Sequence, residues 1–174
     1  TAATFRFMSG AGNSTVNESF TGNLSIQRDG GSTITIISPN TFTGTATTTG
    51  GVMNLKDFGS FQNASAVNVN QGSLYWDDTG LAAVSNRLGA ATAVNLNGGA
   101  LGYYPRQGTA GAVSVGTLNV GLGAGMAFVY PNTGSSGALT FASVTRNTGG
   151  TIVFAAMNGT GLGAEARMYA TSAP

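Results

Sequence analysis

The sequence predicts an all-β fold, a parallel β-solenoid of about six or seven irregular coils that forms one domain over residues 1–174. Helix signals are nearly absent, and short runs of β-branched residues alternate with polar residues between glycines and asparagines. A loose repeat also recurs at intervals of about 20–27 residues, as expected for stacked coils. An antiparallel β-sandwich is the alternative, although its strands usually recur every 8–12 residues without matching side chains at a longer period.

The predicted strands are short, and each is bounded by Gly, Asn or Pro. In chain order they are Thr33–Ile37, Ala66–Asn70, Ala93–Asn97, Ala112–Val115, Met126–Tyr130 and Gly149–Phe154. The segment Leu81–Leu88 has room for a helical turn, but its pattern favours a loop.

Each copy of the repeat has a small residue followed by apolar residues two and four positions later. Copies begin at Gly51, Gly72, Gly99, Ala124 and Gly150, with a weaker one at Ser32. Stacked coils bring equivalent side chains together in interior columns. The first predicted column is Met53, Leu74, Leu101, Met126 and Ile152, and the second is Leu55, Trp76, Tyr103, Phe128 and Phe154. In this register Asn95 lies on the opposite face of its strand from the interior.

Composition excludes several classes of function. Only 7% of the residues are charged, against about 25% in an ordinary soluble domain, and the seven Lys and Arg residues are scattered. Nucleic-acid binding is therefore not expected, because it needs a basic patch or stripe. The chain has no Cys and no His, so we predict no metal site and no cofactor. No apolar run approaches the roughly 18 residues needed to span a bilayer.

One stretch carries a resemblance to a known family. Residues 40–55 read NTFTGTATTTGGVMNL and resemble the autotransporter-associated β-strand repeat. Partial matches are a copy that begins at Ser19 and two second halves at Ala66–Trp76 and Ala93–Tyr103. The resemblance implies a right-handed parallel β-helix in a secreted or surface-displayed region of a bacterial protein. The residues make physical sense as a coil, with Phe42 pointing inward and Gly44 permitting a tight turn.

The candidate binding residues gather after one predicted strand. Asp77–Asp78 is the only adjacent pair of acids, and it follows Trp76. Together with Tyr104 these residues suggest a glycan subsite, in which aromatic rings lie beside carboxylates; the two acids also suggest a weak calcium site. Neighbouring strand residues point to opposite faces, so both acids need not reach one ligand. A plain turn, with Asp side chains satisfying backbone groups, is therefore the favoured interpretation, and no catalytic residue is predicted.

These observations favour a non-catalytic extracellular protein, secreted or on a bacterial cell surface. It would be a rigid spacer or a self-associating subunit of a filament or matrix. A glycan-binding module is the alternative, and a polysaccharide-degrading β-helix enzyme is less favoured because the carboxylates are few and scattered. The end segments Thr4–Met8 and Glu165–Ala170 do not resemble amphipathic caps, so we expect copies to associate end to end.

Overall fold

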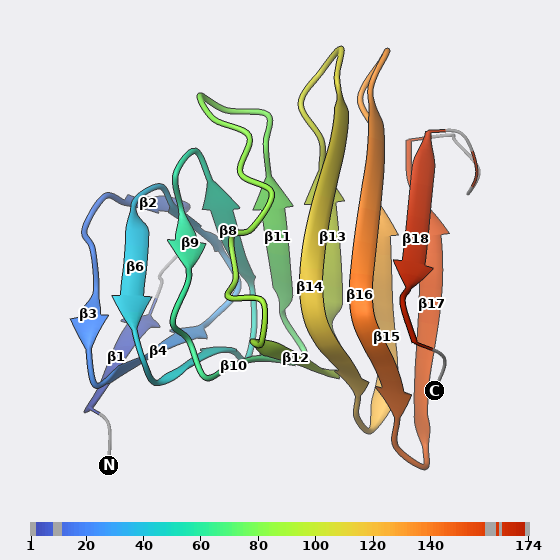
Figure 1. The fold of residues 1–174 in the computed structure, drawn as a ribbon. Coiled ribbons are helices and arrows are strands. Elements are labelled where there is room, and N and C mark those ends of the chain that lie inside the picture. Colours follow the sequence, from blue (N-terminus) through green and yellow to red (C-terminus); the bar gives the residue numbers. More distant parts are fainter. Residues whose placement is uncertain (1–2, 9–11, 159–162, 164, 173–174) are drawn as a thin grey trace.

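The computed structural model describes residues 3–8, 12–158, 163 and 165–172, and their regular structure consists entirely of strands (Figure 1). Every strand pairs with its neighbours in the parallel sense. Successive coils stack along one axis, so the strands form sheets that run the length of the molecule. The predicted parallel β-solenoid is therefore confirmed, and the antiparallel sandwich is excluded.

Two long sheets form the main walls of the solenoid. The eight-stranded sheet contains, in spatial order, β1 (Ala3–Met8), β4 (Leu24–Asp29), β7 (Thr45–Thr48), β10 (Ala66–Asn70), β12 (Ala93–Asn97), β14 (Ala110–Val120), β16 (Ser136–Arg146) and β18 (Ala166–Ala170). The seven-stranded sheet contains β17 (Gly150–Ala156), β15 (Gly123–Val129), β13 (Ala100–Tyr104), β11 (Ser73–Asp77), β8 (Val52–Lys56), β5 (Thr33–Ile36) and β2 (Ser14–Val16).

A third wall is built from different strands in the N-terminal and C-terminal parts of the solenoid. In the N-terminal part it is a three-stranded sheet of β3 (Thr21–Gly22), β6 (Pro39–Phe42) and β9 (Ser60–Phe61). The coil that follows β11 has a loop here, which contains the segment predicted to be a loop. In the C-terminal part the first halves of the 11-residue strands β14 and β16 take over this wall. A backbone hydrogen bond connects the loop to β14 in this wall: the Ser114 amide donates to the Ser85 carbonyl of the loop.

The interior columns are confirmed in the middle of the solenoid. Met53, Leu74 and Leu101 lie opposite one another on β8, β11 and β13, and all three are buried. The second column runs in the same way through Leu55, Trp76 and Tyr103. Strand side chains alternate between faces, so this register also places Asn95 on the outside of β12, as predicted.

Beyond Tyr103, the predicted columns are wrong because the register of β15 is shifted by one residue. Leu101 and Tyr103 pair with Ala127 and Val129 instead of Met126 and Phe128. The residues that follow in the two columns are Phe154 and Ala156. A one-residue slip exchanges the two faces of a strand, and β15 carries apolar side chains on both faces. Alternation of apolar and polar residues therefore did not determine which face is interior.

The Asn-Thr-Phe-Thr-Gly segment forms one corner of a coil. Asn40 is buried there, where its side-chain oxygen accepts from the Phe20 amide at 2.8 Å and its amide donates to the Ser38 carbonyl at 2.7 Å. Phe42 is fully buried in the core, as predicted. A Cβ atom on Gly44 would lie 2.4 Å from the Leu24 carbonyl oxygen of the coil below, so only glycine fits this approach.

Candidate functional site

The predicted binding residues separate between the inside and the outside of the solenoid. Trp76 on β11 is fully buried, and Asp78 just beyond the strand is buried as well. Asp77 and Tyr104 face outward, and they lie opposite each other on β11 and β13. A glycan on the surface can therefore meet Asp77 and Tyr104 but cannot reach Trp76 or Asp78, so the four residues do not form one subsite.

Asp78 belongs to a buried polar network. Its Oδ1 forms an ion pair with Arg87 Nη2 at 2.6 Å, and both side chains are almost completely buried. Its Oδ2 accepts from the Tyr103 hydroxyl at 3.1 Å. Burial, followed by the negative charge of Asp78, raises the pKa of Tyr103 far above its ordinary value, so the phenol stays protonated as a donor.

Arg87 connects the loop that follows β11 to the coils around it. Its guanidinium donates to the carbonyls of Asp57 at 2.9 Å, Gly59 at 2.8 Å and Asp77 at 3.1 Å. The loop is also held by Val84, whose amide donates to Asp78 Oδ1 at 3.1 Å. Asp78 is therefore a structural residue that satisfies loop groups, and its carboxylate is already occupied by protein donors.

Asp77 is paired on the outer face. Its Oδ2 lies 3.2 Å from Lys56 Nζ and accepts from Asn54 Nδ2 at 3.1 Å, while its Oδ1 accepts from the Thr79 amide at 2.9 Å. Partial burial opposes ionisation of Asp77, but the hydrogen bonds from Thr79, Asn54 and Lys56 outweigh it and lower its pKa. A carboxyl held in the ionised form is poorly suited to donate a proton as a general acid.

Four aromatic side chains form the outer aromatic cluster on the seven-stranded sheet: Tyr75, Tyr104, Phe128 and Tyr130. The ring centroids of Tyr75 and Tyr104 are 5.3 Å apart, those of Tyr104 and Tyr130 are 5.3 Å apart, and Phe128 lies 5.7 Å from Tyr75 and 5.8 Å from Tyr104. Gly102, opposite Phe128, makes this arrangement possible, because a Cβ atom there would lie 2.4 Å from the Phe128 ring.

The outer aromatic cluster presents phenol hydroxyls and aromatic ring faces. Burial, followed by the neighbouring Tyr75, raises the pKa of Tyr104 to about 12. Phe128 is buried beneath the tyrosines, which remain partly exposed. Such rings can stack on an apolar sugar face while the hydroxyls form hydrogen bonds. Of this group, only Tyr104 was predicted from the sequence as a binding residue. The outward position of Tyr75 follows from the same alternation, since it precedes the inward Trp76.

The outer face of the eight-stranded sheet carries a second feature that sequence reasoning missed, the polar ladder. Asn68, Asn95 and Asn119 stack on β10, β12 and β14, with amide-to-oxygen distances of 2.7 and 2.8 Å between successive side chains. Thr47 on β7 accepts from Asn68 at 3.3 Å, and Thr145 on β16 donates to Asn119 at 2.6 Å. The signal was present in the sequence, where Ala-Val-Asn-Val-Asn and Ala-Val-Asn-Leu-Asn recur in equivalent strands.

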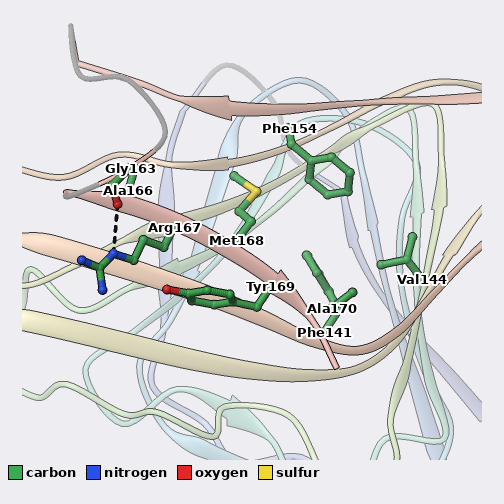
Figure 2. Close-up of a pocket in the computed structure, with 9 residues that line it drawn as sticks. All are labelled: Phe141, Val144, Phe154, Gly163, Ala166, Arg167, Met168, Tyr169 and Ala170. Atoms are coloured by element: carbon green, nitrogen blue, oxygen red, sulfur yellow. Dashed lines mark hydrogen bonds between the residues drawn. The ribbon is translucent and has the colours of Figure 1, made fainter. Parts of the chain in front are cut away.

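The C-terminal end of the solenoid holds an apolar cavity of about 670 Å³. Figure 2 shows side chains of β16, β17 and β18 around it, among them Val144, Phe154 and Met168. Among the described residues there is no group of three or more acidic side chains placed to hold a metal ion. The described part of the chain also contains no helix of the length and apolar character that a bilayer span requires.

Comparisons of the chain with protein-family models, with curated proteins and with solved structures return no match.

Proposed function

We propose that this chain is a non-catalytic structural module of a secreted or bacterial cell-surface protein. It acts as a rigid β-solenoid spacer or as a self-associating subunit of a filament or matrix. The observation that carries the proposal is the polar ladder, which bonds coil to coil from β7 to β16 on the outside of the sheet. Side chains that could have faced a ligand instead connect neighbouring coils of the protein.

The ladder supports stiffness for an energetic reason. Each side-chain hydrogen bond contributes about 0.5–1.5 kcal/mol net, and each one joins strands of successive coils. In a solenoid each coil contacts only its neighbours, so these bonds add directly to the coil-to-coil term that resists bending and unravelling. The ladder therefore supports a mechanical role.

The extracellular setting rests on composition and on the resemblance to the autotransporter-associated repeat. The surface is wetted by hydroxyl and amide groups, with only 7% of residues charged. In the Asn-Thr-Phe-Thr-Gly segment, Asn40, Phe42 and Gly44 each have a distinct role at a coil corner, which is what a repeat motif of stacked coils requires.

The test combines imaging with a chemical assay. Electron microscopy of the purified chain at micromolar concentration should show rods or filaments. Incubation with a panel of polysaccharides should release no reducing ends. Release of reducing ends by the chain, lost in an Asp77→Asn variant, would contradict the non-catalytic assignment, because Asp77 is the outward carboxylate beside the aromatic rings.

A second candidate function, glycan binding, is favoured by the outer aromatic cluster. Three partly exposed tyrosines gather on one face beside Asp77, which supplies a hydrogen-bond acceptor. A glycan array with the unaltered chain tests it. Binding should fall at least tenfold in a Tyr104→Ala variant and should persist in a Tyr169→Ala variant, since Tyr169 is an exposed tyrosine on β18, outside the cluster. Equal loss in both variants would contradict a site at the cluster.

A further inference from the structure

Two tyrosines of the outer aromatic cluster occupy equivalent places in neighbouring coils. Tyr104 ends β13 and precedes Pro105, and Tyr130 directly follows β15 and precedes Pro131. The Tyr130 amide donates to the Tyr103 carbonyl at 2.8 Å, so the parallel register of the two strands continues as far as Tyr104 and Tyr130. The two tyrosines are therefore direct neighbours, each from its own coil.

The prolines that follow the two tyrosines fix the backbone on which the rings stand. A residue before proline is restricted to extended conformations, and both prolines are buried. Each proline carbonyl also accepts from an asparagine of the next coil. Pro105 accepts from Asn132 Nδ2 at 3.3 Å, and Pro131 accepts from Asn158 Nδ2 at 2.9 Å. The two tyrosine side chains therefore start from backbone positions that are held in the same way.

The rings of Tyr104 and Tyr130 lie against each other outside the solenoid. Their centroids are 5.3 Å apart, and their planes are inclined by 30°. Because directly paired residues carry side chains of equal length, equivalent carbons of the two rings lie opposite each other, including those ortho to the hydroxyls. Tyr75 approaches Tyr104 at the same centroid distance but at 62°, and the residue it pairs with on β13 is Gly102. Tyr104 and Tyr130 are therefore the pair best placed to form a bond from ring to ring.

Exposure and charge favour oxidation at this pair. Tyr104 and Tyr130 are partly exposed, so an oxidant can take electrons from them at the surface. Asp77 lies opposite Tyr104 on β11, and its negative charge favours the loss of an electron from that ring. The other two tyrosines lie elsewhere, since Tyr103 is fully buried in the core and Tyr169 is on β18 of the other long sheet.

We propose that Tyr104 and Tyr130 form a modification site, at which a peroxidase supplied with hydrogen peroxide joins the two rings as dityrosine. Each phenol gives up one electron and one proton, and the two phenoxyl radicals couple through their ortho carbons. The ortho hydrogens then move to the oxygens, so one C–C bond replaces two C–H bonds and both hydroxyls are restored. The electrons and protons reduce one hydrogen peroxide to two waters. The bond links successive coils covalently and requires no second copy of the chain.

Treatment of the dilute full chain with a peroxidase and hydrogen peroxide, followed by trypsin, tests the site. Trypsin cuts after Lys and Arg, so Tyr75, Tyr104 and Tyr130 fall in three different peptides, 57–87, 88–106 and 107–146. The expected product is a monomeric chain with dityrosine fluorescence and a mass lower by two hydrogen atoms. Its digest should contain peptide 88–106 linked to peptide 107–146.

Conservative variants assign the link to single residues, with circular dichroism reporting that each one is folded. Tyr104→Phe and Tyr130→Phe should each lower the dityrosine of the monomeric chain at least tenfold. Tyr75→Phe and Tyr169→Phe, the matched controls, should leave it unchanged. Peptide 57–87 linked to 88–106 as the main product, or dityrosine undiminished in folded Tyr104→Phe or Tyr130→Phe, would overturn the proposal. So would a folded chain that forms no internal dityrosine under conditions that couple free tyrosine.

Discussion

At the residue scale, Asp78 and Arg87 form an ion pair inside the solenoid. In an Arg87→Met variant Asp78 would remain buried without its charged partner. We expect this change to lower the free energy of unfolding by about 3–5 kcal/mol, because an uncompensated buried charge is costly. Urea denaturation measures it. Lys56→Met is the matched control, since it removes the partly exposed partner of Asp77 and should cost at most about 1 kcal/mol.

The interior register makes a second prediction at this scale. Leu101 is fully buried between Leu74 and Ala127, so Leu101→Asp places an unpaired charge in the core. We expect a loss of about 4 kcal/mol or more, or failure to fold. Asn95→Asp, on the outer face, removes one donor of the polar ladder and should cost about 1 kcal/mol. Similar losses for both variants in thermal melts would show that the register is wrong.

The residues of the candidate site show what local pattern could not supply. Alternation of side chains, combined with the placement of Trp76 in an interior column, already implied that Asp77 would face outward. Nothing in the sequence marked Arg87 as the partner of Asp78, because it lies in a loop without periodicity and reaches the core only when neighbouring coils close around it. The partners of the two acids, and the burial of Asp78, therefore depended on tertiary contacts.

At the scale of single elements, β11 and β15 show how far strand patterns predict a fold. In β11 the inward Leu74 and Trp76 alternate with Ser73, Tyr75 and Asp77, and the predicted face is correct. In β15, Met126 and Phe128 on one face are as apolar as Ala127 and Val129 on the other, so period-two alternation gives no preference. The deciding factor was Gly102 on the neighbouring strand, which leaves space for the Phe128 ring outside.

Gly102 therefore offers a test of the outer aromatic cluster. In Gly102→Ala the added methyl would meet the Phe128 ring, with Cβ 2.4 Å from its nearest atom, so we expect a loss of about 1–3 kcal/mol. The same substitution in a Phe128→Ala background should cost much less, and a double-mutant cycle in urea measures the difference. Gly31→Ala, at a position with open space, is the control. Additive losses would contradict the contact between Gly102 and Phe128.

The same cluster predicts a response to alkaline pH. Folding raises the pKa of Tyr104 from 10.0 to about 12, because burial and the adjacent Tyr75 disfavour the phenolate. The folded state is thus favoured by keeping the phenol protonated. This contribution is complete below pH 10 and is lost as the pH rises through about 12. Besides Tyr103, ultraviolet absorbance of tyrosinate should show a second late-titrating group that is missing in Tyr104→Phe, and ionisation of Tyr104 near pH 10 would contradict its partial burial in the cluster.

At the scale of the whole molecule, stability comes from repetition of contacts between neighbouring coils. The parallel fold could be predicted from the sequence because the small-x-apolar-x-apolar frame recurs at nearly every coil. The polar ladder could not be predicted from any one repeat. It appears only when strands of separate coils lie in register, where Asn95 meets Asn68 and Asn119.

The last prediction is that divalent metal ions do not stabilise this solenoid. Both acids of the turn, which were considered above as a weak calcium site, already accept from protein donors. Asp78 accepts from Arg87 and Tyr103, and Asp77 accepts from Asn54, Thr79 and Lys56. Calcium would have to displace these donors and to gather six to eight oxygen ligands, whereas the two carboxylates lie on opposite sides of the wall. Melting curves recorded with EDTA and with millimolar calcium should therefore coincide. A rise of several degrees with calcium that is abolished by Asp77→Asn would show that a metal site forms at this turn.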